Sequence, residues 1–415
     1  MKKFMNWLAN SFAPKMNELC SRPWIAAVSS SMQKVIPFIL SGSLIYFYNV
    51  FRSYLPALPD LGPIADYTFG LISLTLAFVV GQQCMEKLDK PLYTTNCGLV
   101  AVAVFLMFIL PQTNADGNMV ILGGRMGATG IAVGLAAGLF TSIIFYLYSK
   151  LHMFENSTAI PDFISGWINT ILPTLFCLGI SMVLTISCQM DIFALVILAF
   201  SPLANFAQTL PGLILCCLIP AFFYSMGISS WLFGAVTTPI YLAGIQGNID
   251  AVAAGLPAMN ITTSETVFVT ALITMGGMGA TLALNVLMMR SKSKKLKTLG
   301  RIFIGPSLFN INEPIVFGAP IVFNPILMVP MWINAIVGPI IVYTIMRLGL
   351  LNIPCMLNQV GNVPMPISTV MITQDLRGIL WAAVMFVVYV FIWYPFFKVY
   401  EKECLLEEVQ HGENA

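Results

Sequence analysis

The sequence predicts an all-α polytopic membrane protein with about ten transmembrane helices. Hydrophobic residues make up 58% of the 415 residues and charged residues only 9%, whereas an ordinary soluble domain is roughly 25% charged. Hydrocarbon must therefore cover much of the surface. With about 20 residues in each span, the length suits roughly ten helices better than several soluble domains.

Apolar runs place these helices along the chain. Six clear runs lie at 24–50, 67–85, 92–111, 127–149, 166–188 and 211–228. Four later runs are interrupted by Gly, Pro, Asn and Thr, at 231–245, 266–289, 315–348 and 378–397. Lipid cannot hydrogen-bond the backbone groups that such breaks expose, so we expect unwound or re-entrant pieces between full spans. Residues 1–15 lack the pattern of a cleavable signal, so we expect the first run to be retained.

Charge placement predicts the orientation. The stretch from Arg290 to Arg301 holds six of the twenty basic residues. The positive-inside tendency puts this basic loop in the cytoplasm, and an even number of crossings puts both termini there too. Arg52 and Arg125 are exceptions to the bias. The same charges also suit anionic lipid or a partner protein. The acidic tail from Glu401 to Glu408 is predicted to be a solvated cytoplasmic helix end.

The cysteines, histidines and glycine clusters favour no metal, cofactor or nucleotide. The nine cysteines include no Cys-x-x-Cys pair, and both histidines lie outside the predicted spans, so neither a metal site nor a histidine proton relay is expected. The glycine clusters at 123–130 and 275–281 lack the Lys-Ser/Thr of a phosphate loop. Small residues of this kind are typical of closely packed membrane helices.

The segment from Phe309 to Gly318 is the strongest candidate site. It places Glu313 and the carboxamides of Asn310 and Asn312 beside a proline within apolar sequence. An ionisable side chain at bilayer depth costs on the order of 3 kcal/mol, so such a residue usually faces a partner, a cavity or a solute. Carboxylates and carboxamides together hydrogen-bond the hydroxyls of a neutral polyol, which indicates a sugar site. The alternative is a glutamate satisfied by backbone amides at a helix break.

A second candidate wall runs from Phe223 to Trp231, where Ser229 and Ser230 interrupt an apolar run. Their hydroxyls, with the neighbouring aromatic rings, suit a sugar. Ordinary helix packing explains the same pattern equally well.

These blocks resemble a known family. The run from Asn312 to Gly318, with the Pro-Ile-Val-Phe-Asn-Pro that follows at 320–325, is similar to the signature of the membrane permease subunit (enzyme IIC component) of the bacterial sugar phosphotransferase system, in its lactose/cellobiose/chitobiose branch. Gly276-Gly277-Met278-Gly279-Ala280-Thr281 resembles that family's Gly-Gly-x-Gly-Ala-Thr. The resemblance covers nearly the whole chain.

The resemblance implies an architecture and partners. The expected form is a homodimer in the bacterial cytoplasmic (inner) membrane, each protomer with about ten spans and two re-entrant hairpins. Residues 1–190 would form the dimerisation half and residues 191–415 the sugar-binding half. The sugar would be carried inward and phosphorylated on its 6-hydroxyl by a phosphocysteine of a B component. The sequence shows no soluble A-type or B-type domain, so these are expected as separate proteins.

The resemblance also assigns the site. The family's glutamate maps onto Glu313, which would orient or deprotonate the acceptor hydroxyl. Asn310 and Asn312 would bind sugar hydroxyls beside it, with Ser229 and Ser230 contributing from the facing hairpin.

Two departures leave the sugar open. Chitobiose-type members carry Phe-Gly-Ile-His where this chain reads Met226-Gly227-Ile228-Ser229. They also carry a stacking tryptophan shortly before a Met-Pro, where this chain reads Asn362-Val363-Pro364-Met365-Pro366. The rival functions are an ion-coupled secondary sugar carrier without phosphorylation, which also uses discontinuous helices and a buried acid, and a sensor built on a permease scaffold.

Overall fold

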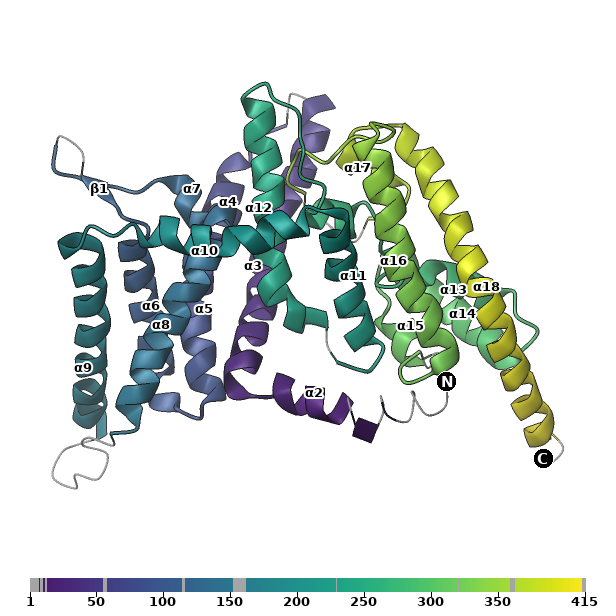
Figure 1. Cartoon of the computed structure of the whole chain (residues 1–415), viewed down its shortest axis with the longest axis horizontal. Coiled ribbons are helices and arrows are strands. Elements are labelled where there is room, and N and C mark those ends of the chain that lie inside the picture. Colours follow the sequence, from purple (N-terminus) through teal and green to yellow (C-terminus); the bar gives the residue numbers. More distant parts are fainter. Residues whose placement is uncertain are drawn as a thin grey trace. The chain divides into compact units, whose positions relative to one another are not determined.

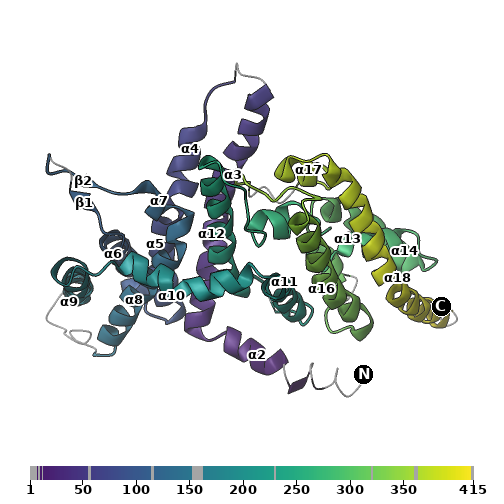
Figure 2. The same cartoon turned by 45° about the horizontal axis from the view of Figure 1, so that its top comes forward.

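The computed structural model is mostly helical, as predicted (Figures 1 and 2). It describes residues 13–54, 58–113, 116–151, 162–228, 230–318, 321–358 and 363–412, together with Trp7, Asn10 and Ser11. These residues divide into two compact units. The N-terminal unit comprises Glu18–Leu203 and Trp231–Pro239, and the C-terminal unit comprises Ala204–Ser230 and Ile240–Ala415 with Met1–Asn17.

The N-terminal unit is built from helices with one short hairpin. In chain order its elements are α3 (Pro23–Tyr54), α4 (Gly62–Tyr67), η2 (Phe69–Leu71), α5 (Ile72–Lys87), η3 (Pro91–Tyr93), α6 (Thr94–Phe108), β1 (Gln112–Thr113), β2 (Met119–Val120), α7 (Gly123–Met126), η4 (Ala128–Gly130), α8 (Ile131–Ser149), α9 (Asp162–Met182) and η5 (Val183–Ser187). α2 (Ala13–Cys20), α10 (Ile192–Ala207), η6 (Ser230–Phe233) and α12 (Gly234–Ala253) each lie at or across a boundary between the units.

Small residues let the helices of this unit approach closely. α5 packs against α3, α6 and α8. A Cβ on Gly81 of α5 would lie 2.9 Å from the Cys97 carbonyl oxygen of α6, and one on Gly134 of α8 would lie 2.5 Å from the Ser73 oxygen. Arg125, an exception to the charge bias, pairs with Asp191 at 3.1 Å. The ion pair explains how this cation is accommodated.

The C-terminal unit contains the candidate site. Its remaining elements are α11 (Leu210–Tyr224), η7 (Glu265–Val269), α13 (Thr281–Met289), α14 (Lys294–Leu308), α15 (Glu313–Gly318), α16 (Pro325–Arg347), α17 (Ile367–Thr373) and α18 (Arg377–Gly412). α16 packs against both α11 and α18, and α13 packs against α14 and α18. Local sequence sets the starts of three helices: the side chains of Thr209, Ser293 and Asn324 cap α11, α14 and α16.

Most predicted apolar runs correspond to helices, but one does not. The run at 266–289 consists of the π-helical turn η7, a stretch of turns and the short helix α13. Gly276, Gly277 and Gly279 all have positive φ there, so this cluster forms a loop and not the helix contact that we expected. α10 is an apolar helix that the run-based reading did not identify. It meets α11 at a bend of 92°.

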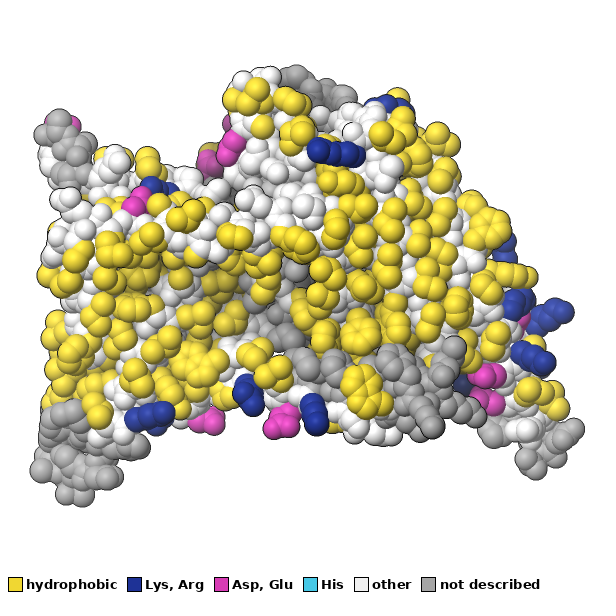
Figure 3. All heavy atoms as spheres, viewed as in Figure 1, with side chains coloured by type: hydrophobic (Ala, Val, Ile, Leu, Met, Phe, Trp, Pro, Cys, Tyr) yellow, Lys and Arg dark blue, Asp and Glu magenta, His cyan; other side chains and the backbone are white. Residues whose placement is uncertain are grey.

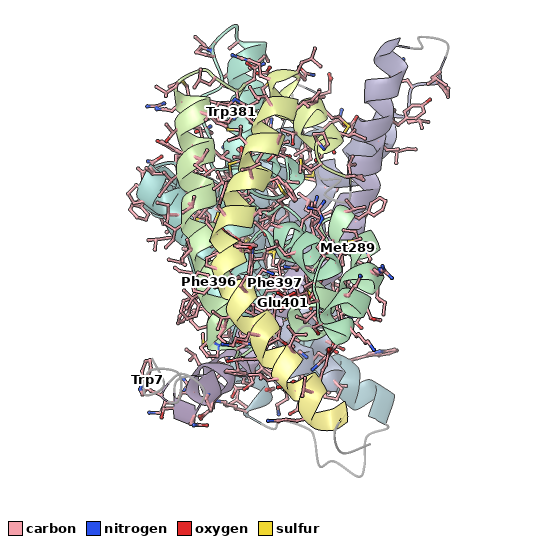
Figure 4. All side chains as sticks on the ribbon, turned by 90° about the vertical axis from the view of Figure 1, so that its right-hand side faces the viewer. Trp7, Met289, Trp381, Phe396, Phe397 and Glu401 are labelled. Atoms are coloured by element: carbon pink, nitrogen blue, oxygen red, sulfur yellow. The ribbon has the colours of Figure 1, made fainter. Side chains whose placement is uncertain are left out.

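The acidic tail is solvated only in part, which corrects the prediction: Glu403 and Glu407 are exposed, whereas Glu401 and Glu408 are bonded to the basic loop. Glu401 is only 4% exposed. Its carboxylate accepts from the Ser291 hydroxyl at 2.7 Å and from the Lys292 amide at 2.8 Å. Glu408 accepts from the Ser293 hydroxyl at 2.7 Å and from the Lys295 amide at 2.9 Å. Figure 4 shows Glu401 and Phe397 on the side of α18 that faces α13 and α14. The tail therefore holds the basic loop in place.

The membrane-crossing character is clear in several helices. Five of the described helices are individually long and apolar enough to cross a bilayer, and the bent pair α10 and α11 would make a sixth. Figure 3 shows hydrophobic side chains over the visible face of α16, with basic side chains near its upper end. Charge is thus kept from the middle of this helix face, as a lipid-facing surface requires.

Candidate functional site

The segment that carries Glu313 joins two helices of the C-terminal unit. α14 ends at Leu308, and α15 begins at Glu313. The Asn312 carbonyl accepts from the amides of Ile315 and Val316 at 3.1 and 2.9 Å. Pro314 therefore occupies the second position of a new helix, where its missing N–H costs no hydrogen bond. The predicted helix break is a helix start that fixes Glu313 in its first turn.

Three asparagines hold the glycine loop, which we define as Gly276–Gly279, beside this helix start. The Asn310 Oδ1 accepts from the Gly276 amide at 3.0 Å. The Asn312 Nδ2 donates to the Met278 carbonyl at 2.9 Å. The Asn334 Nδ2, from the middle of α16, donates to the Gly279 carbonyl at 3.0 Å. Carboxamides supply both the donors and the acceptor that this strained backbone needs.

The close approach of the loop to Asn312 requires a glycine. Gly277 has φ +103, a conformation that residues with a Cβ rarely adopt. A Cβ there would lie 2.5 Å from the Asn312 Cβ. The glycine block and the Asn-Glu-Pro block, which sequence reasoning treated separately, thus form one structure.

Glu313 differs from its asparagine neighbours. Its side chain is exposed, whereas Asn312 is 5% exposed. Among the described residues no hydrogen bond or ion pair to the Glu313 carboxylate is found, so the reading in which backbone amides satisfy this glutamate receives no support. A carboxylate at the first position of a helix points its charge toward the positive end of the helix dipole. Its two oxygens remain available to accept from a ligand.

The second candidate wall adjoins the same region through the loop after α11. The Ser225 carbonyl accepts from the Phe323 amide at 3.1 Å, and the Ser225 hydroxyl accepts from the Trp332 indole at 2.9 Å. A Cβ on Gly227 would contact the Val322 side chain at 3.4 Å. Ser229 lies outside the described residues. Ser230 is half-buried at the start of η6.

The sequence analysis did not single out three polar residues of the C-terminal unit that the structure shows to be buried. Glu265 is fully buried, and its carboxylate accepts from the Asn358 amide at 3.1 Å and the Ser264 hydroxyl at 2.9 Å. Asn334 lies within an apolar helix, and Tyr224 ends another. An acid beside the apolar run at 266–289 was the available signal for Glu265. Nothing local distinguishes Asn334 or Tyr224 from ordinary residues of apolar helices.

Comparison with known proteins agrees with these features. The family described as phosphotransferase system, EIIC, matches residues 29–335. The lichenan permease IIC component of Bacillus subtilis (strain 168) is 27% identical over 361 residues, which cover 83% of this chain and 79% of the relative. The lactose-specific EIICB component of Staphylococcus aureus (strain COL) is 26% identical, and the match covers 95% of this chain and 72% of the relative.

A solved structure has the same fold. The crystal structure of the transporter ChbC, the IIC component from the N,N'-diacetylchitobiose-specific phosphotransferase system, matches with a TM-score of 0.83 and 24% identity. The match covers 97% of this chain and 99% of ChbC. The family match takes in most of the sequence, including the Asn-Glu-Pro block and the glycine loop. The chain therefore belongs to the phosphotransferase system EIIC family, the sugar permeases of that system.

Proposed function

We propose that this EIIC permease carries a disaccharide or related glycoside inward and presents it to separate A and B components for phosphorylation. The observation that carries the proposal is the exposed Glu313 carboxylate, which has no partner among the described residues and sits on a helix start fixed by the glycine loop. The substrates in the names of the relatives, lichenan, lactose and N,N'-diacetylchitobiose, are all built from linked sugars.

The residues have separate tasks in this proposal. Glu313 accepts hydrogen bonds from sugar hydroxyls and orients, or deprotonates, the acceptor hydroxyl. Asn310 and Asn312 hold the glycine loop in place and bind sugar hydroxyls beside Glu313. Ser229 and Ser230 add hydroxyls from the loop after α11. Phosphoryl transfer depends mainly on in-line positioning and charge stabilisation, so alignment of the hydroxyl is the larger part of this role.

The finer architecture belongs to the same proposal. We infer about ten spans with two re-entrant hairpins, with the first half forming a homodimer and the second half binding the sugar. α10 and α11, which meet at 92°, are the pair whose geometry best suits a re-entrant piece. The basic loop and both termini face the cytoplasm, where the B component has to reach the sugar.

One experiment tests the function and the glutamate together. Membrane vesicles containing the chain, purified A and B components and phosphoenolpyruvate-derived phosphoryl groups are supplied with labelled lactose, cellobiose or N,N'-diacetylchitobiose. We expect a phosphorylated product from at least one sugar, with no loss when proton and sodium gradients are collapsed. Gradient-driven accumulation of unmodified sugar without the partners would instead establish the secondary carrier.

The variant Glu313→Gln should lower this phosphorylation about ten- to a hundredfold, because a hydrogen bond to a charged group contributes roughly 1.5–3 kcal/mol. The matched control is Glu403→Gln, the same change at an exposed position of α18, which should behave as wild type. Wild-type phosphorylation by the Glu313 variant would remove this residue from the site.

A further inference from the structure

Tyr224, the last residue of α11, has a buried hydroxyl that no known role explains. The residue is 7% exposed. Its hydroxyl is buried and has no hydrogen-bond partner within the part of the chain that the structure describes. Leaving such a group unpaired is unfavourable, so each case in a native protein calls for an explanation. A ligand that supplies the missing partner is one.

A ring contact places Tyr224 on the face of α15 that carries Glu313. Its ring packs edge-on against the ring of Phe317, with centroids 6.0 Å apart and planes at 90°. Phe317 follows Glu313 by four residues on α15, and residues so spaced share one face of a helix. The tyrosine therefore lies along the Glu313 face of α15.

The position of Tyr224 is well fixed. The next residue, Ser225, is bonded through its carbonyl to the Phe323 amide and through its hydroxyl to the Trp332 indole. α11 also packs along α16. The hydroxyl is therefore held on the Glu313 side of α15 by the fold and not by a bond of its own.

The chemistry of the pair defines a ligand. A phenol hydroxyl is a donor, and an ionised carboxylate is an acceptor. Both groups lie along the same face of α15, and no hydrogen bond joins them directly. A sugar hydroxyl is both donor and acceptor, so a single one can accept from Tyr224 and donate to Glu313.

We propose that Tyr224 is a substrate-binding residue whose hydroxyl donates to the same sugar hydroxyl that Glu313 accepts from. This inference rests on the proposed sugar-binding function of Glu313 and adds a neutral donor to it. No described residue pairs this hydroxyl, and the bound sugar supplies its acceptor.

The test is Tyr224→Phe, which removes only the hydroxyl. The matched control is Tyr148→Phe in α8, because Tyr148 is 6% exposed and its hydroxyl is likewise buried without a partner among the described residues. Purified proteins are compared by thermal unfolding without sugar and by equilibrium binding of radiolabelled lactose, cellobiose and N,N'-diacetylchitobiose. Both variants should melt at or above the wild-type temperature. Only Tyr224→Phe should bind the sugar more weakly, by roughly five- to tenfold for one lost neutral hydrogen bond.

The double variant Tyr224→Phe with Glu313→Gln tests the shared hydroxyl. If both residues act on one sugar hydroxyl, the fold-loss of sugar affinity in the double variant is smaller than the product of the fold-losses in the two single variants. A multiplicative loss overturns the sharing.

Three other outcomes also decide the matter. If wild type and Tyr224→Phe bind a probe sugar equally, the inference is wrong while the proposed function stands. If the empty Tyr224 variant melts below wild type, the hydroxyl has a structural partner and the inference is wrong. If wild type binds none of the three sugars, the proposed function fails for them and the inference falls with it.

Discussion

The glycine loop gives the sharpest test of how the site is built, through the substitution Gly277→Ala. Gly277 has φ +103, and a Cβ would lie 2.5 Å from the Asn312 Cβ. Placing an L residue in such a conformation costs about 1–3 kcal/mol. Moving the Asn312 side chain away sacrifices its bond to the Met278 carbonyl, a further ~0.5–1.5 kcal/mol. The total cost is about 1.5–4.5 kcal/mol, and it arises at Asn312, the residue that precedes Glu313.

We expect this cost to appear in both stability and function. The variant should unfold at a lower temperature in detergent, and its phosphorylation of sugar with the A and B components should fall by at least about tenfold, since 1.4 kcal/mol corresponds to that factor. Gly305→Ala is the matched control. A Cβ on Gly305, within α14, meets no atom within 4 Å, so alanine there should be neutral or stabilising by up to about 1 kcal/mol. Wild-type stability and phosphorylation in Gly277→Ala would refute the coupling between the loop and the glutamate.

Two further predictions concern the basic loop. Glu401→Ala removes the buried acceptor of the Ser291 hydroxyl and the Lys292 amide, so tryptic cleavage at the basic loop should become roughly tenfold faster or more. Glu403→Ala, at an exposed position of the same helix, should leave the cleavage rate unchanged, and equal rates for the two variants would contradict the docking of the tail. In a variant without native cysteines, Thr298→Cys should react with an impermeant thiol reagent only after lysis, and Met119→Cys, 66% exposed in wild type, should react in whole cells. Labelling of position 298 from outside would show that the orientation is the reverse of the one predicted. The B component could then not reach the site from the cytoplasm.

The helices of the first half were largely predictable from the sequence. Runs such as 92–111 and 127–149 are continuous and end where polar residues begin, and the structure places α6 and α8 within them. The missed helix α10 had a local signal, because the Asp191 carboxylate accepts from the Ala194 amide at its start. A short apolar helix capped by an aspartate is readable in principle.

The second half was less predictable because its structure depends on distant partners. The run at 266–289 was expected to be interrupted, but the sequence did not show where; the structure places a loop there, with positive φ at Gly276, Gly277 and Gly279. The acidic tail looked solvated because its partners lie 109 or more residues earlier in the chain. The residues of the Asn-Glu-Pro block were identified correctly as polar groups at a helix boundary. Their bonds to the glycine loop depend on tertiary structure that spacing does not encode.

The asparagines and Glu313 prepare the site in different ways. Asn310, Asn312 and Asn334 are bonded to the glycine loop, so on our proposal binding of a sugar carries no entropic cost of ordering that backbone. Glu313 is exposed, which lets water satisfy its charge until a hydroxyl replaces it. On our proposal Tyr224 is the opposite case, a buried donor that no described residue satisfies and that the sugar pairs.

This combination bears on selectivity. A ligand with a hydroxyl at the right place gains one bond to a charged acceptor and relieves one unpaired donor. A deoxy analogue gains neither and also excludes water from Glu313. Sites that leave their own polar groups unpaired reject such analogues far more strongly than apolar pockets reject a change in size. On this proposal the permease selects sugars that have a hydroxyl at the position of phosphorylation. The residues that bind the sugar therefore also determine which of its hydroxyls is phosphorylated.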